Sequence, residues 1–259
     1  MFIYIPTFGR PEKQITFKAL PQCFQKKVVF VVRDEEYKAV QRLFGGKCKE
    51  IIVQEGTGVA AGRQTAVEHS PHDAICFLDD DIRFSTRLPD WDYTTNNRAL
   101  KSSVQDVQAG IEWIEEQLNE YDCVGLGARG GNNGIPKRWV NLNYRIMRSF
   151  GVSKSALRRY NLRFDDFYYW EDFHVAMSLL ELGRENIVSV NWVTDGVTNA
   201  KGGVVRNLKK MWIQARKFVD LHPSAVLVEK KFKHGDKELA DTIFPDLRIA
   251  WKKTLGTKA

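Results

Sequence analysis

Short apolar runs alternate with amphipathic segments along the first half of the chain. Four of the runs are continuous, at residues 2–5, 28–32, 51–53 and 74–78. Continuous apolar runs of this length are typical of strands that are buried on both faces. Residues 34–45 and 59–69, which lie between them, have the composition and spacing of helices. Strands joined by helices favour a parallel sheet with right-handed crossovers.

One more unit of the same kind follows. Apolar residues from Val104 to Leu118 keep the helical spacing of three and four, and a short strand is expected at residues 123–126. We therefore expect an α/β fold in which a Rossmann-like mixed, mostly parallel sheet is flanked by helices. The first strand is not followed by a GxGxxG motif, which argues against a dinucleotide cofactor.

Amphipathic helices are expected in the last part of the chain. Phe173, Met177 and Leu180 share one helical face, and the segment 206–219 has its basic residues on one arc and its apolar residues opposite. No repeat or low-complexity linker divides the sequence. We expect a single domain over residues 1–220 and a basic, helical C-terminal extension over residues 221–259.

Composition indicates a folded globular protein. The 259 residues are 43% hydrophobic, with a net charge of +7. The longest apolar runs are far shorter than the roughly 20 residues of a membrane-spanning helix, and the first residues are not typical of a signal peptide. The four cysteines are too widely spaced for a metal knuckle. We expect a cytoplasmic protein without a membrane span, as a monomer or small homo-oligomer.

The positive charge is concentrated in two blocks. Residues 132–164 contain 8 basic and no acidic side chains, and residues 200–259 contain 14 basic and 6 acidic ones. A charged run is often only a solvated surface, but the aromatic residues between these arginines favour a surface that binds nucleic acid. The side chains predicted to meet phosphates are Lys137, Arg138, Arg145, Arg158, Arg159, Arg206, Lys209 and Lys210.

Three consecutive aspartates, Asp79, Asp80 and Asp81, follow the fourth predicted strand. Ligands of open α/β sheets bind at this edge. Adjacent carboxylates repel one another and are stabilised by a divalent cation, and Mg²⁺ or Mn²⁺ suits such hard oxygen ligands. The alternative is an acidic turn without a ligand.

A second acidic pair, Glu171 and Asp172, begins the predicted helix near Phe173. Acidic residues are common at this place because of the helix dipole, so the pair alone is a weak signal. The aromatic-rich segment 164–170 before it is typical of a pocket around a carboxylate base.

These motifs together resemble the GT-A glycosyltransferases over roughly residues 1–200. The resemblance rests on the loop Pro6–Pro11 after the first strand, the segment Gly58–Gln64, the three aspartates and the Trp170–Asp172 motif, in this order. It implies that a nucleotide-sugar donor is the substrate, with UDP-glucose first among the candidates, and that Mn²⁺ or Mg²⁺ is the cofactor.

The resemblance also implies roles for individual residues. Those that would bind the donor are Thr7, Arg10, Asp34, Arg63, Asp79 and Asp80, with Arg63 near the diphosphate. Asp79 and Asp81 would form the metal-binding DXD pair. Asp172, beside Glu171, would be the base of an inverting reaction. The segment 192–203 lacks the histidine that many such enzymes use as a further metal ligand.

The size of the chain, its first loop and its basic blocks resemble the TET-associated glycosyltransferases of bacteriophages, which are implicated in glycosylating 5-hydroxymethylcytosine in DNA. This resemblance implies a DNA acceptor and the cytoplasm of a host cell. Three alternatives remain open: a GT-A enzyme with a glycan or lipid acceptor, a sugar nucleotidyltransferase, and a non-catalytic nucleic-acid-binding protein on a transferase scaffold.

Overall fold

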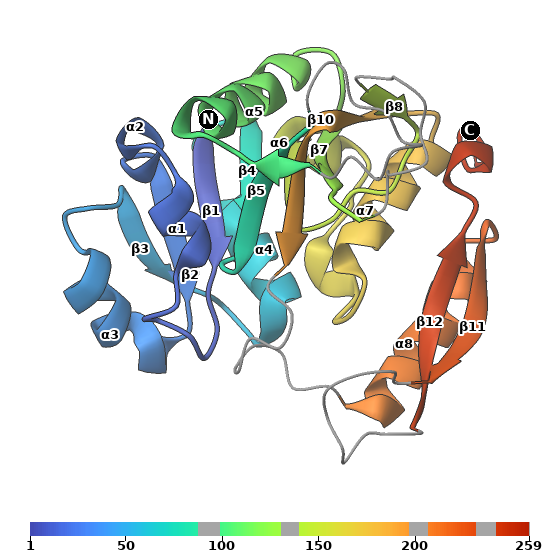
Figure 1. Ribbon diagram of the computed structural model, residues 1–259. Helices are drawn as coiled ribbons and strands as arrows, with labels where there is room; N and C mark the ends of the chain where they lie inside the picture. Colours follow the sequence, from blue (N-terminus) through green and yellow to red (C-terminus); the bar gives the residue numbers. More distant parts are fainter. Residues whose placement is uncertain (88–98, 131–139, 197–206, 232–241, 259) are drawn as a thin grey trace.

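The computed structural model describes residues 1–87, 99–130, 140–196, 207–231 and 242–258 (Figure 1). Its first half follows the predicted alternation. The elements are β1 (Phe2–Pro6), α1 (Ile15–Ala19), α2 (Gln22–Gln25), β2 (Val28–Val32), α3 (Asp34–Phe44), β3 (Glu50–Val53), α4 (Gly58–His69) and β4 (Ala74–Leu78). The four strands are parallel, in the order β3-β2-β1-β4. The predicted Rossmann-like half is confirmed.

The second half extends this sheet. Its elements are β5 (Ile82–Thr86), β6 (Leu100–Lys101), α5 (Val104–Gln117), β7 (Cys123–Ala128), β8 (Val140–Leu142), β9 (Ser149–Ser153), α6 (Lys154–Arg159), α7 (Glu171–Glu181) and β10 (Asn186–Gly196). The strand order becomes β3-β2-β1-β4-β9-β7-β10-β5-β6, with β8 paired to β10. β7 and β10 are parallel to each other, and β9 is antiparallel to both of its neighbours.

Helices cover both faces of the sheet because successive side chains of a strand point to opposite sides. Ile3 and Ile5 of β1 pack with α1, α2, α3 and α5, whereas Tyr4 packs in the cluster that contains α4, α6 and α7. The continuous apolar runs of the sequence therefore supply two cores at once. The sheet and the helices on its two faces form three layers. The loops that follow the strands are not part of these layers and can contain a binding site.

The sequence pattern does not predict β9. All five residues of this strand are buried, between β4 and β7. Gly151 allows α5 to approach the strand, since a Cβ at this position would lie 2.6 Å from Ile114 Cγ2 and 2.7 Å from Leu118 Cδ1. The basic block of residues 132–164 is thus not one continuous surface, because its middle is core.

The C-terminal part contains α8 (Leu208–Leu221) and an antiparallel hairpin of β11 (Ala225–Lys231) and β12 (Ile243–Ile249). It lies next to α7, beyond the edge of the main sheet (Figure 1). Phe173 of α7, Phe218 of α8 and Leu247 of β12 share one apolar cluster. The predicted amphipathic helix is confirmed in α8. The expectation that residues 221–259 are helical is wrong, because their described part forms the hairpin and one short 3₁₀ turn at Trp251–Lys253. A domain boundary near residue 220 stays a prediction. None of the helices in the described ranges is long and apolar enough to cross a membrane.

Candidate active site

The three aspartates form a turn at the carboxyl end of β4, and neighbouring elements fix the backbone of this turn. The Asp79 N–H donates to the carbonyl of Arg148 at 2.8 Å. On the other side the Thr16 hydroxyl of α1 donates to the Asp79 carbonyl at 2.5 Å and accepts from the Ile82 N–H at 3.0 Å. These bonds hold the aspartate side chains at the loop edge of the sheet.

Arg10, from the loop after β1, neutralises two of the aspartates. Its guanidinium donates to Asp80 at 2.6 Å and to Asp81 at 2.8 Å. Burial raises the pKa of Asp80 to about 7, although Arg10 opposes the shift. The second oxygen of Asp80, Oδ2, is buried without a hydrogen-bond partner. The first loop and the acidic turn therefore form one unit.

Arg63 of α4 joins the two acidic clusters. Its side chain is 3% exposed, and its terminal nitrogens donate to Asp79 at 2.8 Å and to Glu171 at 2.5 Å. Burial raises the pKa of Asp79 and of Glu171, and the Arg63 guanidinium opposes both shifts. Arg63 therefore brings together two carboxylates that lie far apart in the sequence.

Glu171 and Asp172 differ in their surroundings. Glu171 is buried and tied to Arg63, whereas the Asp172 side chain is 15% exposed and lies 4.0 Å from the same guanidinium. Trp170, the residue before them, has a left-handed backbone with φ of 61°. Strained residues of this kind concentrate at functional sites. Of the pair, Asp172 is the carboxylate that is open to a substrate.

The remaining predicted donor-binding residues lie in the first loop and at the start of α3. Thr7 is buried, and its hydroxyl donates to the side chain of Gln14. The Gly9 N–H donates to Glu36 of α3 at 2.5 Å, which ties the loop to that helix. Asp34 is exposed in the first turn of α3 and has no ion pair in the described part of the chain. A role in donor binding stays a prediction for Thr7 and Asp34.

Three residues predicted to bind nucleic acid lie on the side of α7 and α8. The Arg145 guanidinium lies over the ring of Phe173, next to Asp172, at 4.9 Å from the ring centroid. Lys209 and Lys210 are exposed on α8, and the Lys210 ammonium lies 3.1 Å from the centroid of the Tyr168 ring. These contacts bring basic groups close to the start of α7.

Arg158 and Arg159 lie elsewhere. They are exposed on α6 and line a hollow of about 410 Å³ together with Asp73, the residue before β4. Since the aspartate turn follows the other end of β4, the two sites are separated by the length of this strand, about 20 Å. Lys137, Arg138 and Arg206 fall outside the described residues. Binding of nucleic acid by any of these residues stays a prediction.

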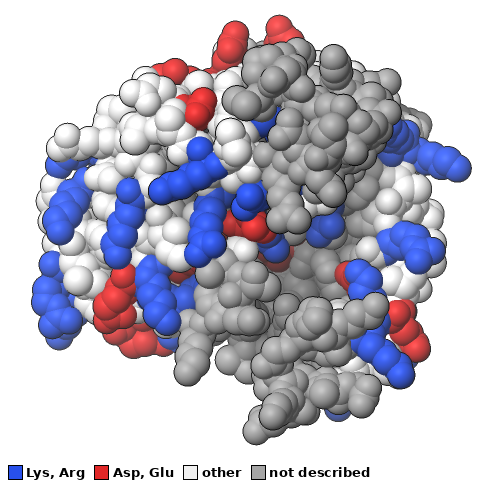
Figure 2. All heavy atoms as spheres, viewed as in Figure 1, with Lys and Arg blue, Asp and Glu red and all other residues white. Residues whose placement is uncertain are grey.

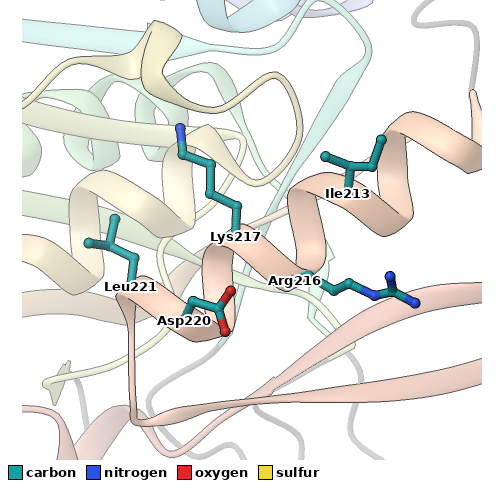
Figure 3. Close-up of a pocket in the computed structure, with 5 residues that line it drawn as sticks. All are labelled: Ile213, Arg216, Lys217, Asp220 and Leu221. Atoms are coloured by element: carbon teal, nitrogen blue, oxygen red, sulfur yellow. The ribbon is translucent and has the colours of Figure 1, made fainter.

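On the face shown in Figure 2, several Lys and Arg side chains gather over the left half of the described surface, and Asp and Glu side chains lie mainly below and above them. A second hollow, of about 550 Å³, lies on α8 (Figure 3) and is lined by Ile213, Arg216, Lys217, Asp220 and Leu221. The Lys217 ammonium donates to the Asp166 carbonyl at 2.8 Å. None of the predicted catalytic residues lines this hollow.

A family model of the TET-associated glycosyltransferases matches residues 1–203. The chain belongs to this family. The matched part of this TET-associated glycosyltransferase contains the first loop, both acidic clusters and Arg63, and it excludes α8 and the hairpin. A search of the curated proteins found no match.

Solved structures share the fold at low sequence identity. Glucosyl-3-phosphoglycerate synthase from Mycobacterium tuberculosis, in complex with Mn²⁺, UDP and phosphoglyceric acid, has a TM-score of 0.51 and 10% identity, and the alignment covers 95% of this chain and 86% of that one. S. aureus TarS 1–349 has a TM-score of 0.48 and 13% identity, over 85% of this chain and 66% of that one. This chain thus spans just under two thirds of the TarS chain. The predicted GT-A fold is confirmed.

Sequence reasoning missed two residues that adjoin the aspartates. Thr16 lies in a short helix whose contact with the aspartate turn has no sequence signature. Arg148 belongs to the basic block, but its place beside Asp79 depends on the unpredicted strand β9. The sequence signal for that place is the period-two spacing of the apolar residues Phe150 and Val152, which are both buried in β9.

Proposed function

We propose that this protein transfers a hexose from a nucleotide sugar to a hydroxyl group of a modified base in DNA. The observation that carries the proposal is the ion-pair bridge of Arg63, which joins Asp79 to Glu171. Through this bridge the aspartate turn, whose carboxylates are suited to bind a metal and the donor, lies close to Asp172. Asp172 is suited to deprotonate an acceptor.

The aspartate turn fits a divalent cation such as Mn²⁺ or Mg²⁺. Its donors are hard carboxylate oxygens, and the buried Asp80 Oδ2 lacks a partner. No three His, Cys, Asp or Glu side chains in the described ranges converge on one point. A cation held by Asp79 and Asp81 would therefore complete its ligands with donor phosphates, as Mg²⁺ commonly does. It would stabilise the charge of the leaving diphosphate.

Asp172 is the proposed general base. It takes the proton of the acceptor hydroxyl while the oxygen attacks the anomeric carbon and the bond to the diphosphate breaks. A single displacement of this kind inverts the configuration at that carbon. Glu171 is a positioning residue, since Arg63 occupies its carboxylate. Thr7, Arg10 and Asp34 are proposed to hold the nucleotide, for which UDP is the first candidate because the synthase of similar fold is in complex with UDP.

The proposed acceptor is DNA that contains 5-hydroxymethylcytosine. Membership in the TET-associated family supports this acceptor, as do the basic groups of Arg145, Lys209 and Lys210 near the site. Phosphate contacts make affinity for DNA fall steeply with salt. Arg158 and Arg159, about 20 Å away, would contact DNA outside the reacting nucleotide.

The decisive experiment is transfer of labelled glucose from UDP-glucose, with Mn²⁺ or with a chelator. The acceptors are DNA that contains 5-hydroxymethylcytosine and the same DNA with cytosine. Metal-dependent label on the hydroxymethylated DNA alone supports the proposal. Hydrolysis of the donor without labelling of DNA would keep the transferase and reject this acceptor. No turnover of any common nucleotide sugar would reject both.

The contribution of α6 is tested separately by the R158A/R159A double variant. We expect it to bind DNA more weakly and to lower the slope of log K against log salt by about 1.8, which corresponds to two lost phosphate contacts. Equal binding by the variant and the wild type would remove α6 from the DNA surface.

A further inference from the structure

The donor proposed above carries a diphosphate, and the inference in this subsection rests on that proposal. The resemblance to GT-A enzymes implies that Arg63 lies near this diphosphate. In the structure Arg63 is buried, and both of its terminal nitrogens donate to carboxylates. Its Nε has no partner among the described residues but is buried as well, and turning the guanidinium toward a phosphate would break the bond to the buried Glu171, which is unfavourable. A basic side chain other than Arg63 is then the candidate to bind the diphosphate together with the cation on Asp79 and Asp81.

Arg148 lies beside the same aspartates. Its carbonyl accepts the Asp79 N–H at 2.8 Å. Its guanidinium lies against the backbone of Gly196, where an added Cβ would be 2.9 Å from Nη1. Gly196 ends β10 and pairs with Ile82, the residue after Asp81. The guanidinium is therefore held at the strand ends that flank the acidic turn.

The charge of Arg148 opposes the rise that burial causes in the pKa of Asp79, without a direct contact between the two side chains. In the ranges that the structure describes, its guanidinium has no ion pair or hydrogen bond, and the residue is only half-buried. It differs in this respect from Arg10 and Arg63, which are both paired with aspartates of the turn. A free guanidinium with planar, forked donors is well suited to a phosphate group.

The backbone of Arg148 is also unusual. Its φ of 62° is in the left-handed region, which an arginine adopts only at a cost and which glycine adopts freely. The strain is retained at the point where the chain enters β9, next to the Asp79 N–H.

The geometry points to Arg148 as the residue that binds the diphosphate of the nucleotide donor at the aspartate turn. Arg63 then positions the carboxylates and does not contact the donor. The ligand class is a nucleoside diphosphate or its sugar ester, held jointly by Arg148 and by the cation on Asp79 and Asp81.

The test compares UDP with uridine, which lacks phosphates. With Mn²⁺ present, calorimetric titration of R148Q should show UDP binding about tenfold to a hundredfold weaker than in the wild type, the loss expected for a hydrogen bond to a charged group. Binding of uridine, followed by ligand-observed NMR, should be unchanged. R42Q, which removes an exposed arginine of α3, is the matched control and should bind both ligands as the wild type does.

A second variant separates binding from folding. R148G relieves the left-handed backbone, so its unfolding temperature should equal or exceed that of the wild type, while its affinity for UDP falls as in R148Q. Wild-type affinity for UDP in both variants would overturn the role of Arg148 and leave the proposed function intact. Failure of the wild type itself to bind UDP or UDP-glucose with Mn²⁺ would overturn the proposed donor, and this inference with it.

Discussion

The two acidic clusters of the site are similar in chemistry but differ in what holds them. The aspartate turn ends a buried strand, and it is held by Arg10 of the first loop and Thr16 of α1, which are 70 and 63 residues away in the chain. The pair Glu171–Asp172 begins α7, which packs against the main sheet on one side and against α8 and the hairpin on the other. The proposed metal-binding side is thus held by loops at the end of a sheet strand, whereas the proposed base stands on a helix between the sheet and the C-terminal part.

The largest effect should come from removing the link between the clusters. R63M keeps the apolar stem of the side chain but leaves Asp79 and Glu171 without their partner. Loss of one member of a buried ion pair typically costs about 3–5 kcal/mol, and we expect a decrease of this size in the free energy of unfolding, measured with urea. R42M on α3 should have almost no effect. A loss below about 1 kcal/mol in R63M, the range of exposed pairs, would show that each cluster is stable without the bridge.

Substitutions of Glu171 and of Asp172 should have different effects. D172N should lower kcat by about 10²–10⁴-fold, the usual contribution of a general base, with an unchanged unfolding temperature. E171Q should mainly lower stability, because it weakens the bond to Arg63. Steady-state kinetics and thermal unfolding of both variants test this assignment. A greater loss of kcat in E171Q than in D172N would reverse the two roles.

The stability of the region around α7 should also be sensitive to acid. On α7, His174 Nδ1 lies 3.0 Å from His222 Nε2, and His222 Nδ1 lies 2.8 Å from Glu181. Asp166 is 3.6 Å from His174, and Lys217 and Lys258 add positive charge. Burial, with His222 and these lysines, lowers the pKa of His174 from 6.5 to about 3.

The unfolded chain therefore binds a proton at His174 below about pH 6.5, and the folded chain does not. The stability contributed by neutral His174 is complete above this pH and is lost as the pH falls toward 3. Urea midpoints between pH 7.5 and 4.5 should decrease in the wild type and less steeply in H174Q. H72Q, which changes an exposed histidine, should keep the wild-type slope. An unchanged slope in H174Q would remove this residue from the acid response.

The smallest effect should come from the support of the aspartate turn. T16V removes a hydroxyl that bonds to the Asp79 carbonyl and to the Ile82 N–H. We expect a loss of about 1–2 kcal/mol in stability and a higher Mn²⁺ concentration for half-maximal rate. T65V also removes a hydrogen bond, to the Glu55 N–H, but away from the turn, so it should leave the Mn²⁺ requirement unchanged. An equal change of the Mn²⁺ requirement in T16V and T65V would mean that Thr16 has no specific role in the aspartate turn.

Much of the fold and part of the site could be predicted because their signals are local. The apolar runs that become β1, β2 and β4 and the helical spacing of α5 appear in the sequence as such. Asp79–Asp81 could be placed at a ligand-binding edge, since ligands bind at the carboxyl ends of strands in open α/β sheets. The pattern could not indicate β9, because its neighbours β4 and β7 come from distant parts of the chain.

The sequence by itself determined the class of fold, both acidic clusters and the basic character of the chain, since each depends on residues that are close together in sequence. Only the tertiary structure decided how these parts meet. It buries Arg63 between two carboxylates, one of them 108 residues away, and it inserts β9 so that Arg148 lies beside Asp79. The physical reason is that periodicity and helix signals act over a few residues, whereas ion pairs and sheet order depend on how distant segments pack.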